Sequence, residues 1–164
     1  RDSSTSRGLG DVYKRQFPYR AFVCRGENEM LKQHCKDTIT LYNYLGEVEH
    51  RATYTKTVIR NVYMEENRGV MIRVTGNDTA CKIRIALYDD TIQADKPFLP
   101  YHQWAELQTE EKTKNWTLFP GGKDRVCIGI CEREKPPEDS YKINAADRRN
   151  HGQRSLWHWE VTGA

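Results

Sequence analysis

A strict alternation of apolar and polar side chains marks residues 79–88 as the clearest structural signal in the chain. Cys81, Ile83, Ile85 and Leu87 fall on one side of this segment. A period of two over this length is typical of a β-strand with one buried face, because a helix would spread these residues around its whole circumference. We therefore predict a half-buried strand at 79–88.

Weaker alternation predicts further strands. They cover residues 19–25, 38–45, 48–54, 57–64, 69–75, 103–108, 116–119, 125–132 and 155–161. Gly, Asn, Asp and Pro concentrate between them and predict turns at 65–69, 76–78 and 120–122. We predict surface loops at 89–101 and 133–154 and one two-turn helix at 28–36. Over 103–119 we predict a hairpin with a long polar tip, with a short helix across Trp104 and Leu107 as the alternative.

Many short strands, closely spaced turn signals and almost no helix indicate an all-β domain. We predict an antiparallel β sandwich with one short peripheral helix, and the pattern leaves a jelly-roll and an immunoglobulin-like topology open. The sequence has no internal repeat of fixed period, which argues against propellers and solenoids.

The first sixteen residues differ from the rest of the chain. Residues 1–16 show neither helical nor strand periodicity, and they resemble the translated adapter sequence found at the ends of assembled reads. We treat them as a non-native or disordered leader. We expect a single β domain over 17–164, truncated at both ends.

The charge balance does not indicate a nucleic-acid or membrane partner. The chain has 26 Lys and Arg against 23 Asp and Glu, but residues 1–16 hold four of the former and two of the latter. The rest therefore carries a net charge of +1, too little to bind nucleic acid or anionic lipid by charge. No apolar stretch approaches the ~20 residues of a transmembrane helix.

Five cysteines raise the question of metal or disulfide chemistry: Cys24, Cys35, Cys81, Cys127 and Cys131. Cys127 and Cys131 are four apart on a predicted strand, which separates them by about 13 Å and excludes a shared metal ion. We expect instead a bridge between Cys24 and Cys35, and a cross-sheet bridge from Cys81 to Cys127 or Cys131. Buried thiols in a reducing compartment are the alternative.

Two glycosylation sequons begin at Asn77 and Asn115, and both fall in predicted turns where a glycan would fit. About one sequon is expected by chance in a chain of this composition. Together with the predicted disulfides, the sequons favour an exported domain.

Known catalytic motifs are absent from the sequence. It contains no Gly-x-Ser-x-Gly elbow, phosphate loop or dinucleotide fingerprint. A dyad of Cys35 with His50 or His102, or a pair of carboxylates, would have to be assembled by the fold. We therefore expect a non-enzymatic protein.

Acidic side chains follow the clearest strand. Asp89 and Asp90 come directly after it, and Asp95 lies nearby. Loops at one end of a sandwich can gather the roughly six to eight oxygens that Ca²⁺ prefers, although Asp is also a common turn residue. These three carboxylates are the candidate calcium site, and the sequence indicates no other cofactor.

Aromatic residues provide a candidate binding surface. Trp157 and Trp159 lie two apart on a predicted strand, so both rings project from one face, with Glu160 on the other. We expect at least one ring to be buried and the other to lie at the rim of a binding surface. Basic and histidine side chains before the strand complete this surface: Arg148, Arg149, His151 and Arg154.

These observations favour a non-enzymatic recognition module that binds a glycan or a protein through loops and aromatic side chains. The alternatives are a fragment of an enzyme and a structural, capsid- or matrix-like sandwich protein. The sequence does not indicate the ligand or the oligomeric state.

Overall fold

The computed structural model describes residues 33–73, 76–119, 121 and 123–164, and over 68–73 and 76–81 it describes the backbone only. Strands dominate this part of the chain, and every pairing between named strands is antiparallel. The strands are β1 Asp37–Val48, β2 Arg51–Arg73, β3 Gly76–Tyr88, β4 Gln93–Ala94, β5 Arg125–Ile128, β6 Tyr141–Arg149 and β7 His158–Gly163. The helices are α2 Tyr101–Glu106, α3 Thr109–Lys114 and the 3-10 helix η1 Arg154–Leu156. The predicted all-β antiparallel fold is confirmed.

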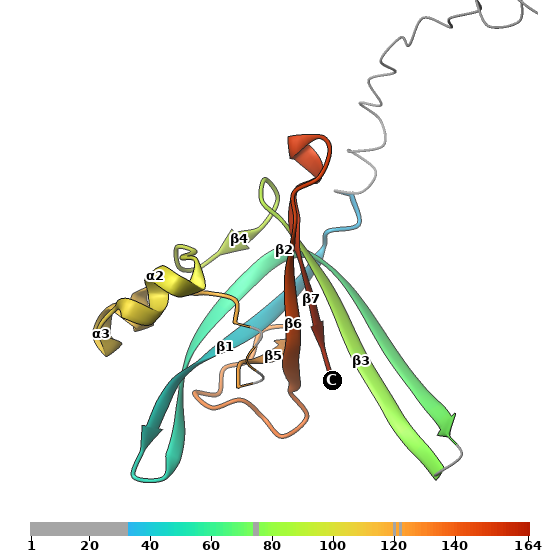
Figure 1. Ribbon diagram of the computed structural model, residues 1–164, viewed down its shortest axis with the longest axis horizontal. Helices are drawn as coiled ribbons and strands as arrows, with labels where there is room; N and C mark the ends of the chain where they lie inside the picture. The colour runs from blue at the N-terminus through green and yellow to red at the C-terminus, as the bar shows by residue number, and fades with distance from the viewer. Residues whose placement is uncertain (1–32, 74–75, 120, 122) are drawn as a thin grey trace, which may run out of the picture.

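The strands pair in a closed order around the core. The order β1-β5-β6-β7-β3-β2-β4 closes because β1 also pairs directly with β2. The first half of β2 pairs with β1 and the second half with β3, whereas β6 begins beside β5 and continues beside β7. Figure 1 shows the consequence: β2 rises beside β1 on one side of the molecule, bends, and descends beside β3 on the other. Two meanders, β1-β2-β3 and β5-β6-β7, are thereby joined edge to edge into a sandwich-like fold.

Both strands that pass between the two halves of the sandwich carry a bulge at an asparagine. In β2 the register with β1 shifts next to Asp37, which leaves Asn61 without a partner there, at φ 59°. In β6 the register with β7 shifts between Ile143 and Ala145, which leaves Asn144 without one. A bulge bends a strand and increases its twist. The two asparagines therefore mark the points where the sheet turns around the core.

Asn61→Val is expected to lower the free energy of unfolding by about 1–2 kcal/mol, because a β-branched side chain is crowded at positive φ. Asn61→Gly is the matched control and should stay within about 0.5 kcal/mol of the parent, since glycine adopts this conformation readily. Urea denaturation measures both values. Equal stability of the two variants would show that the backbone at this bulge imposes no constraint on the side chain.

The core lies inside this ring of strands. Ile83, Ile85 and Leu87 of β3 are each 1% exposed, whereas Lys82 and Arg84 point to solvent. The strand predicted at 79–88 is therefore confirmed over the part whose side chains are described. Full burial of such a side chain contributes about 1.5–3 kcal/mol. The other core side chains come from the remaining long strands and from the segment after α3: Ile39, Leu41, Ile59, Val62, Trp116, Leu118, Val126, Tyr141, Ile143 and Val161.

The structure corrects the predicted turns in the first half of the chain. Segment 65–69 is the middle of β2, and it continues as a strand because β3 pairs with it residue by residue. Segment 76–78, predicted as a second turn, begins β3. The turn between β1 and β2 lies instead at Glu49 and His50, whose φ angles are 49° and 60°.

Two predictions in the second half are also wrong. The loop predicted at 133–154 contains β6, whose Tyr141 and Ile143 are buried. The hairpin predicted at 103–119 is replaced by α2 and α3, and the first of these is the alternative helix across Trp104.

The predicted strand at 19–25 and most of the predicted helix at 28–36 lie outside the described residues. Within the described part of the chain, no helix combines the length and the apolar character needed to span a membrane.

Candidate functional site

A cavity of ≈ 410 Å³ lies beside the end of β3, where β6 and β7 pair. Its lining residues are Asp89, Ile92, Phe98, Trp116, Arg148 and Trp159. Arg148 and Trp159 belong to the predicted aromatic and basic surface, and Asp89 belongs to the predicted calcium site. The cavity thus unites residues that the sequence assigned to different sites.

The pairing of β6 with β7 positions two of the lining side chains. Arg148 and Trp159 are direct partners in that antiparallel pair, so their side chains project from the same face. The guanidinium carbon of Arg148 lies 5.4 Å from the centre of the Trp159 ring, within the range of a cation–π interaction. Trp159 itself is half-buried and packs against the core.

Asp89 fixes the Arg148 guanidinium. Its backbone N–H donates to the Trp157 carbonyl at 3.3 Å, which places Asp89 next to the start of β7. Arg148 donates from Nη1 to Asp89 Oδ1 at 2.6 Å and from Nη2 to Oδ2. These hydrogen bonds raise the pKa of Arg148. Both side chains keep part of their surface exposed, so the pair contributes little to stability and is accessible to a ligand.

Phe98 and Trp116 form an apolar wall of the cavity. The two residues are joined by a parallel bridge, and the Trp116 N–H donates to the Pro97 carbonyl at 3.0 Å. The centre of the Phe98 ring lies 4.8 Å from that of Trp116 and 5.8 Å from that of Trp159. Neither residue was predicted as a site residue, because the sequence pattern places Phe98 in a loop and Trp116 in a hairpin.

Trp116 also brings an unused hydrogen-bond donor to this region. The residue is 1% exposed, and its indole Nε1 has no hydrogen-bond partner in the described structure. A buried donor without an acceptor costs about 1–3 kcal/mol.

The remaining members of the predicted aromatic surface do not line the cavity. Trp157 directly precedes β7, is half-buried, and lies under the guanidinium of Arg154 at 5.9 Å. Its Nε1 donates to the Gly152 carbonyl at 3.4 Å, and His151 is exposed. Neither Trp157 nor Trp159 is fully buried, although we expected one of the two rings to be. Trp159 is the ring that packs against the core.

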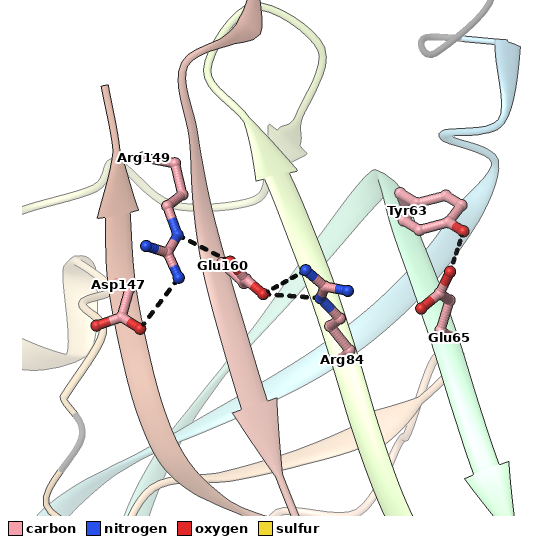
Figure 2. Close-up of polar contacts among 6 residues, drawn as sticks. All are labelled: Tyr63, Glu65, Arg84, Asp147, Arg149 and Glu160. Carbon is pink, nitrogen blue, oxygen red and sulfur yellow. Dashed lines mark hydrogen bonds and ion pairs between the residues drawn. The ribbon is translucent and has the colours of Figure 1, made fainter. Parts of the chain in front are cut away.

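Arg149 is held in an ion-pair network with Asp147 and Glu160 (Figure 2). Because Glu160 follows Trp159 on β7, its side chain points to the opposite face of the sheet. Arg149 Nε donates to Glu160 at 2.8 Å, and Arg149 Nη2 lies 3.7 Å from Asp147. Glu160 also accepts from Arg84 at 2.7 Å. The hydrogen bond from Arg149, together with Arg84, lowers the pKa of Glu160. The outward orientation predicted for Glu160 agrees with these contacts, and Arg149 takes no part in the cavity.

The three predicted calcium ligands are not brought together. Asp89 binds Arg148, and Asp95 accepts from Arg60 at 2.8 Å. Asp90 accepts from its neighbour Thr91 at 3.2 Å. Across residues 33–73, 76–119, 121 and 123–164, no group of three or more His, Cys, Asp or Glu side chains could hold a metal ion.

The structure separates Cys35 from His50, one of the two histidines considered for the alternative catalytic dyad. Cys35 is buried just before β1, whereas His50 is exposed beyond the far end of that strand. His50 is therefore not positioned as a general base for Cys35. His102 is exposed on α2, and its pairing with Cys35 stays a prediction.

The predicted disulfides have two different outcomes. Cys127 and Cys131 are free thiols, so neither is bridged to Cys81, whose side chain lies outside the described structure. Cys24 also lies outside the described residues, so its bridge to Cys35 stays a prediction.

The sequon at Asn115 lies at the C-terminal end of α3. Its Nδ2 donates to the Glu111 carbonyl at 3.0 Å, and both Trp116 and Thr117 are buried. The side chain of Asn77 lies outside the described structure. Glycosylation at either position stays a prediction.

No curated protein and no solved structure matches this chain. The sequence profile of a family of unknown function, DUF6751, matches residues 34–164, which include every described strand and the whole cavity. The chain therefore belongs to this family of unknown function.

Proposed function

We propose that the chain is a non-enzymatic recognition module that binds a saccharide in the cavity between Asp89, Arg148 and Trp159. The observation that carries the proposal is a space of ≈ 410 Å³ lined by three aromatic rings and one ion pair. Pockets for small ligands measure about 300–1,000 Å³ and combine apolar walls with a few convergent polar groups.

A pyranose ring is complementary both to the aromatic wall of the cavity and to its polar groups. Its faces present C–H groups that pack on aromatic rings, and its edge carries hydroxyl groups that both donate and accept hydrogen bonds. Phe98 and Trp159, with centroids 5.8 Å apart, supply the aromatic surface. The Arg148–Asp89 pair presents donors and acceptors side by side.

The site is also ordered before any ligand binds. Arg148 is fixed by Asp89 on one side and by the Trp159 ring on the other. Holding a long side chain in place beforehand reduces the entropy lost on binding, about 0.5–1.5 kcal/mol for each immobilised side chain.

Trp159→Ala is expected to weaken saccharide binding about tenfold to a hundredfold, because one stacking ring contributes about 1–3 kcal/mol. A glycan array with the labelled chain identifies the saccharide, and titration calorimetry measures its affinity. Trp157→Ala is the matched control, since this tryptophan does not line the cavity. It should bind like the parent.

Because Trp159 packs against the core, a second variant separates loss of binding from loss of folding. Arg148→Gln keeps the aromatic wall and should weaken binding about tenfold, with only a small change in melting temperature because the ion pair is partly exposed. Equal losses in Trp157→Ala and Trp159→Ala would contradict the proposal. If no glycan on the array binds, and the chain instead captures a protein in a way that requires Trp159, the ligand of the cavity is a protein and not a saccharide.

The enzyme fragment and the structural sandwich protein stay as predictions. In the described structure Cys35 and His50 lie beyond opposite ends of β1, and no feature of the described residues specifically favours assembly. Concentration-dependent association in sedimentation velocity would support the structural role instead.

A further inference from the structure

A second distinctive site lies at the end of β5. The strand ends at Ile128, and Gly129 takes φ 78°, which turns the chain. The Gly129 N–H donates to the Thr38 carbonyl at 2.7 Å, and Thr40 Oγ1 donates to the Gly129 carbonyl at 2.8 Å. The strand predicted to continue to residue 132 is therefore interrupted, and the extended separation of about 13 Å between its two cysteines does not apply.

Both cysteines lie against the same residue of β1. Cys127 is the direct strand partner of Thr40, and the Cys131 N–H donates to Thr40 Oγ1 at 2.9 Å. Thr40 therefore holds Cys127 and the backbone of Cys131 next to each other, and both thiols are free. Cys127 is 7% exposed and Cys131 is half-buried, so Cys131 is the more accessible to a reagent in solution.

Tyr42 and Lys56 are hydrogen-bonded to the loop that carries Cys131. The buried Tyr42 hydroxyl donates to the Arg133 carbonyl at 2.9 Å. Lys56 Nζ donates to a backbone carbonyl of the same loop at 2.7 Å. The hydrogen bond with Tyr42 and the charges of Arg133 and Lys56 lower the pKa of Cys131, whereas burial raises the pKa of Cys127 to about 12. The thiolate is the reactive form of cysteine.

We propose that Cys127 and Cys131 form an oxidisable dithiol, in which Cys131 reacts first with a hydroperoxide and Cys127 then closes a disulfide. In the first step the Cys131 thiolate attacks one oxygen of hydrogen peroxide, the O–O bond breaks, and the leaving hydroxide takes up a proton to become water. The sulfur is thereby oxidised to a sulfenic acid.

In the second step the Cys127 sulfur attacks the Cys131 sulfur. The S–S bond forms, the S–O bond breaks, and a second water leaves with the Cys127 proton. Overall, two thiols and one hydrogen peroxide give one disulfide and two waters. The charge and the hydrogen bond of Cys131 are among the causes that raise the pKa of Cys127, and oxidation of Cys131 removes that charge before Cys127 attacks.

The inference does not depend on saccharide binding, because neither cysteine lines the cavity. It is testable in one peptide, since tryptic cleavage after Arg125 and Arg133 releases residues 126–133, which contain both cysteines and no other. The folded full chain is treated with hydrogen peroxide, and the remaining thiols are alkylated in denaturant. We expect this peptide to be unalkylated and lighter by two hydrogen atoms than its reduced form.

Single variants separate the two roles. In Cys127→Ser, the sulfenic acid should persist on Cys131 and be trapped by dimedone. In Cys131→Ser, Cys127 should stay reduced. A peptide that stays reduced while peroxide oxidises other cysteines would overturn the proposal.

Tyr42→Phe keeps the buried ring and removes the hydroxyl group. It should slow alkylation of Cys131 by iodoacetamide about tenfold near neutral pH and move the pH–rate profile to higher pH, a readout that a purely structural role would leave unchanged. In the folded parent, Cys131 should react at least about tenfold faster than Cys127, and in urea the two rates should become equal. Equal rates in the folded protein would overturn the assignment of Cys131 as the first thiol to react.

Discussion

Trp116→Ala is expected to lower the free energy of unfolding by about 3–5 kcal/mol. Trp116 is 1% exposed, belongs to the core, and its ring centre lies 4.8 Å from that of Phe98. Removing the ring leaves a cavity that the surrounding strands can close only in part. Because domains of this size are stable by about 5–15 kcal/mol, the variant should be marginally folded.

Urea denaturation followed by far-ultraviolet circular dichroism measures this loss. Trp157→Ala is the matched control, since it removes the same atoms from a half-buried ring, and it should cost less than about 1 kcal/mol. Trp116→Phe should fall between the two, because it keeps a ring and removes the unsatisfied N–H. If both alanine variants unfold at the same urea concentration, Trp116 is not a core residue.

Strands with one buried face could be predicted because their alternation reflects burial directly. In β3 the residues Ile83, Ile85 and Leu87 alternate with solvent-facing side chains over the part of the strand that packs on the core. Alternation along β7 likewise predicts that the side chains of Trp159 and Glu160 point to opposite faces of the sheet. In each case the information lies within one short segment.

The part of β2 where the strand leaves the core could not be predicted in this way: strands were predicted at 57–64 and 69–75, but segment 65–69 between them was predicted as a turn. The second half of β2 pairs with β3 in a hairpin that projects from the molecule (Figure 1), and the described side chains 65–67 are exposed. Such a segment has a polar composition like that of a turn. Its strand conformation comes from pairing with β3, which a local hydrophobic pattern does not report.

Individual residues of the candidate site could be predicted from the sequence, but the way in which they come together could not. Trp159 and Arg148 were both expected at a binding surface, but the pairing between them depends on the bulge at Asn144. A shift of one residue reverses the faces of a strand. Without the bulge, Arg149 would share the face of Trp159 in place of Arg148.

The proximity of Cys127 and Cys131 also depends on contacts that the local sequence does not report. Gly129 inside a predicted strand is the local signal, since glycine in a strand often marks a bend. A strand predicted as continuous through Gly129 separates Cys127 from Cys131, and this prediction is wrong. The approach of the loop to Thr40 and Tyr42 of β1 depends on residues distant in sequence.

The pH dependence of stability is expected to come largely from Asp124. This carboxyl group is 3% exposed, and it accepts hydrogen bonds from the Tyr44 N–H and from Asn43 Nδ2, both at 2.8 Å. Asn43 Nδ2 also donates to the Thr117 carbonyl, so the cluster joins β1 to the segment after α3. Burial raises the pKa of Asp124 to about 6, although its hydrogen bonds act to lower it.

A raised pKa means that the folded protein retains a proton that the unfolded chain, with an Asp pKa near ~3.9, has already released. The free energy of unfolding should therefore fall by about 3 kcal/mol in total as the pH rises from about 3 to about 7, with about 2 kcal/mol of the fall between pH 4 and 6, and this contribution should be absent above about pH 7. Urea denaturation at several pH values between these limits measures the change.

Asp124→Asn removes the titrating group and should flatten this part of the profile. Asp139→Asn, at an exposed position, removes the same charge and should retain the fall. A fall that persists in Asp124→Asn would assign the titration to another group. A parent protein whose stability does not fall between pH 4 and 6 would show that the hydrogen bonds from Asn43 and Tyr44 outweigh burial, because a carboxylate that accepts several N–H donors keeps a low pKa even in the interior.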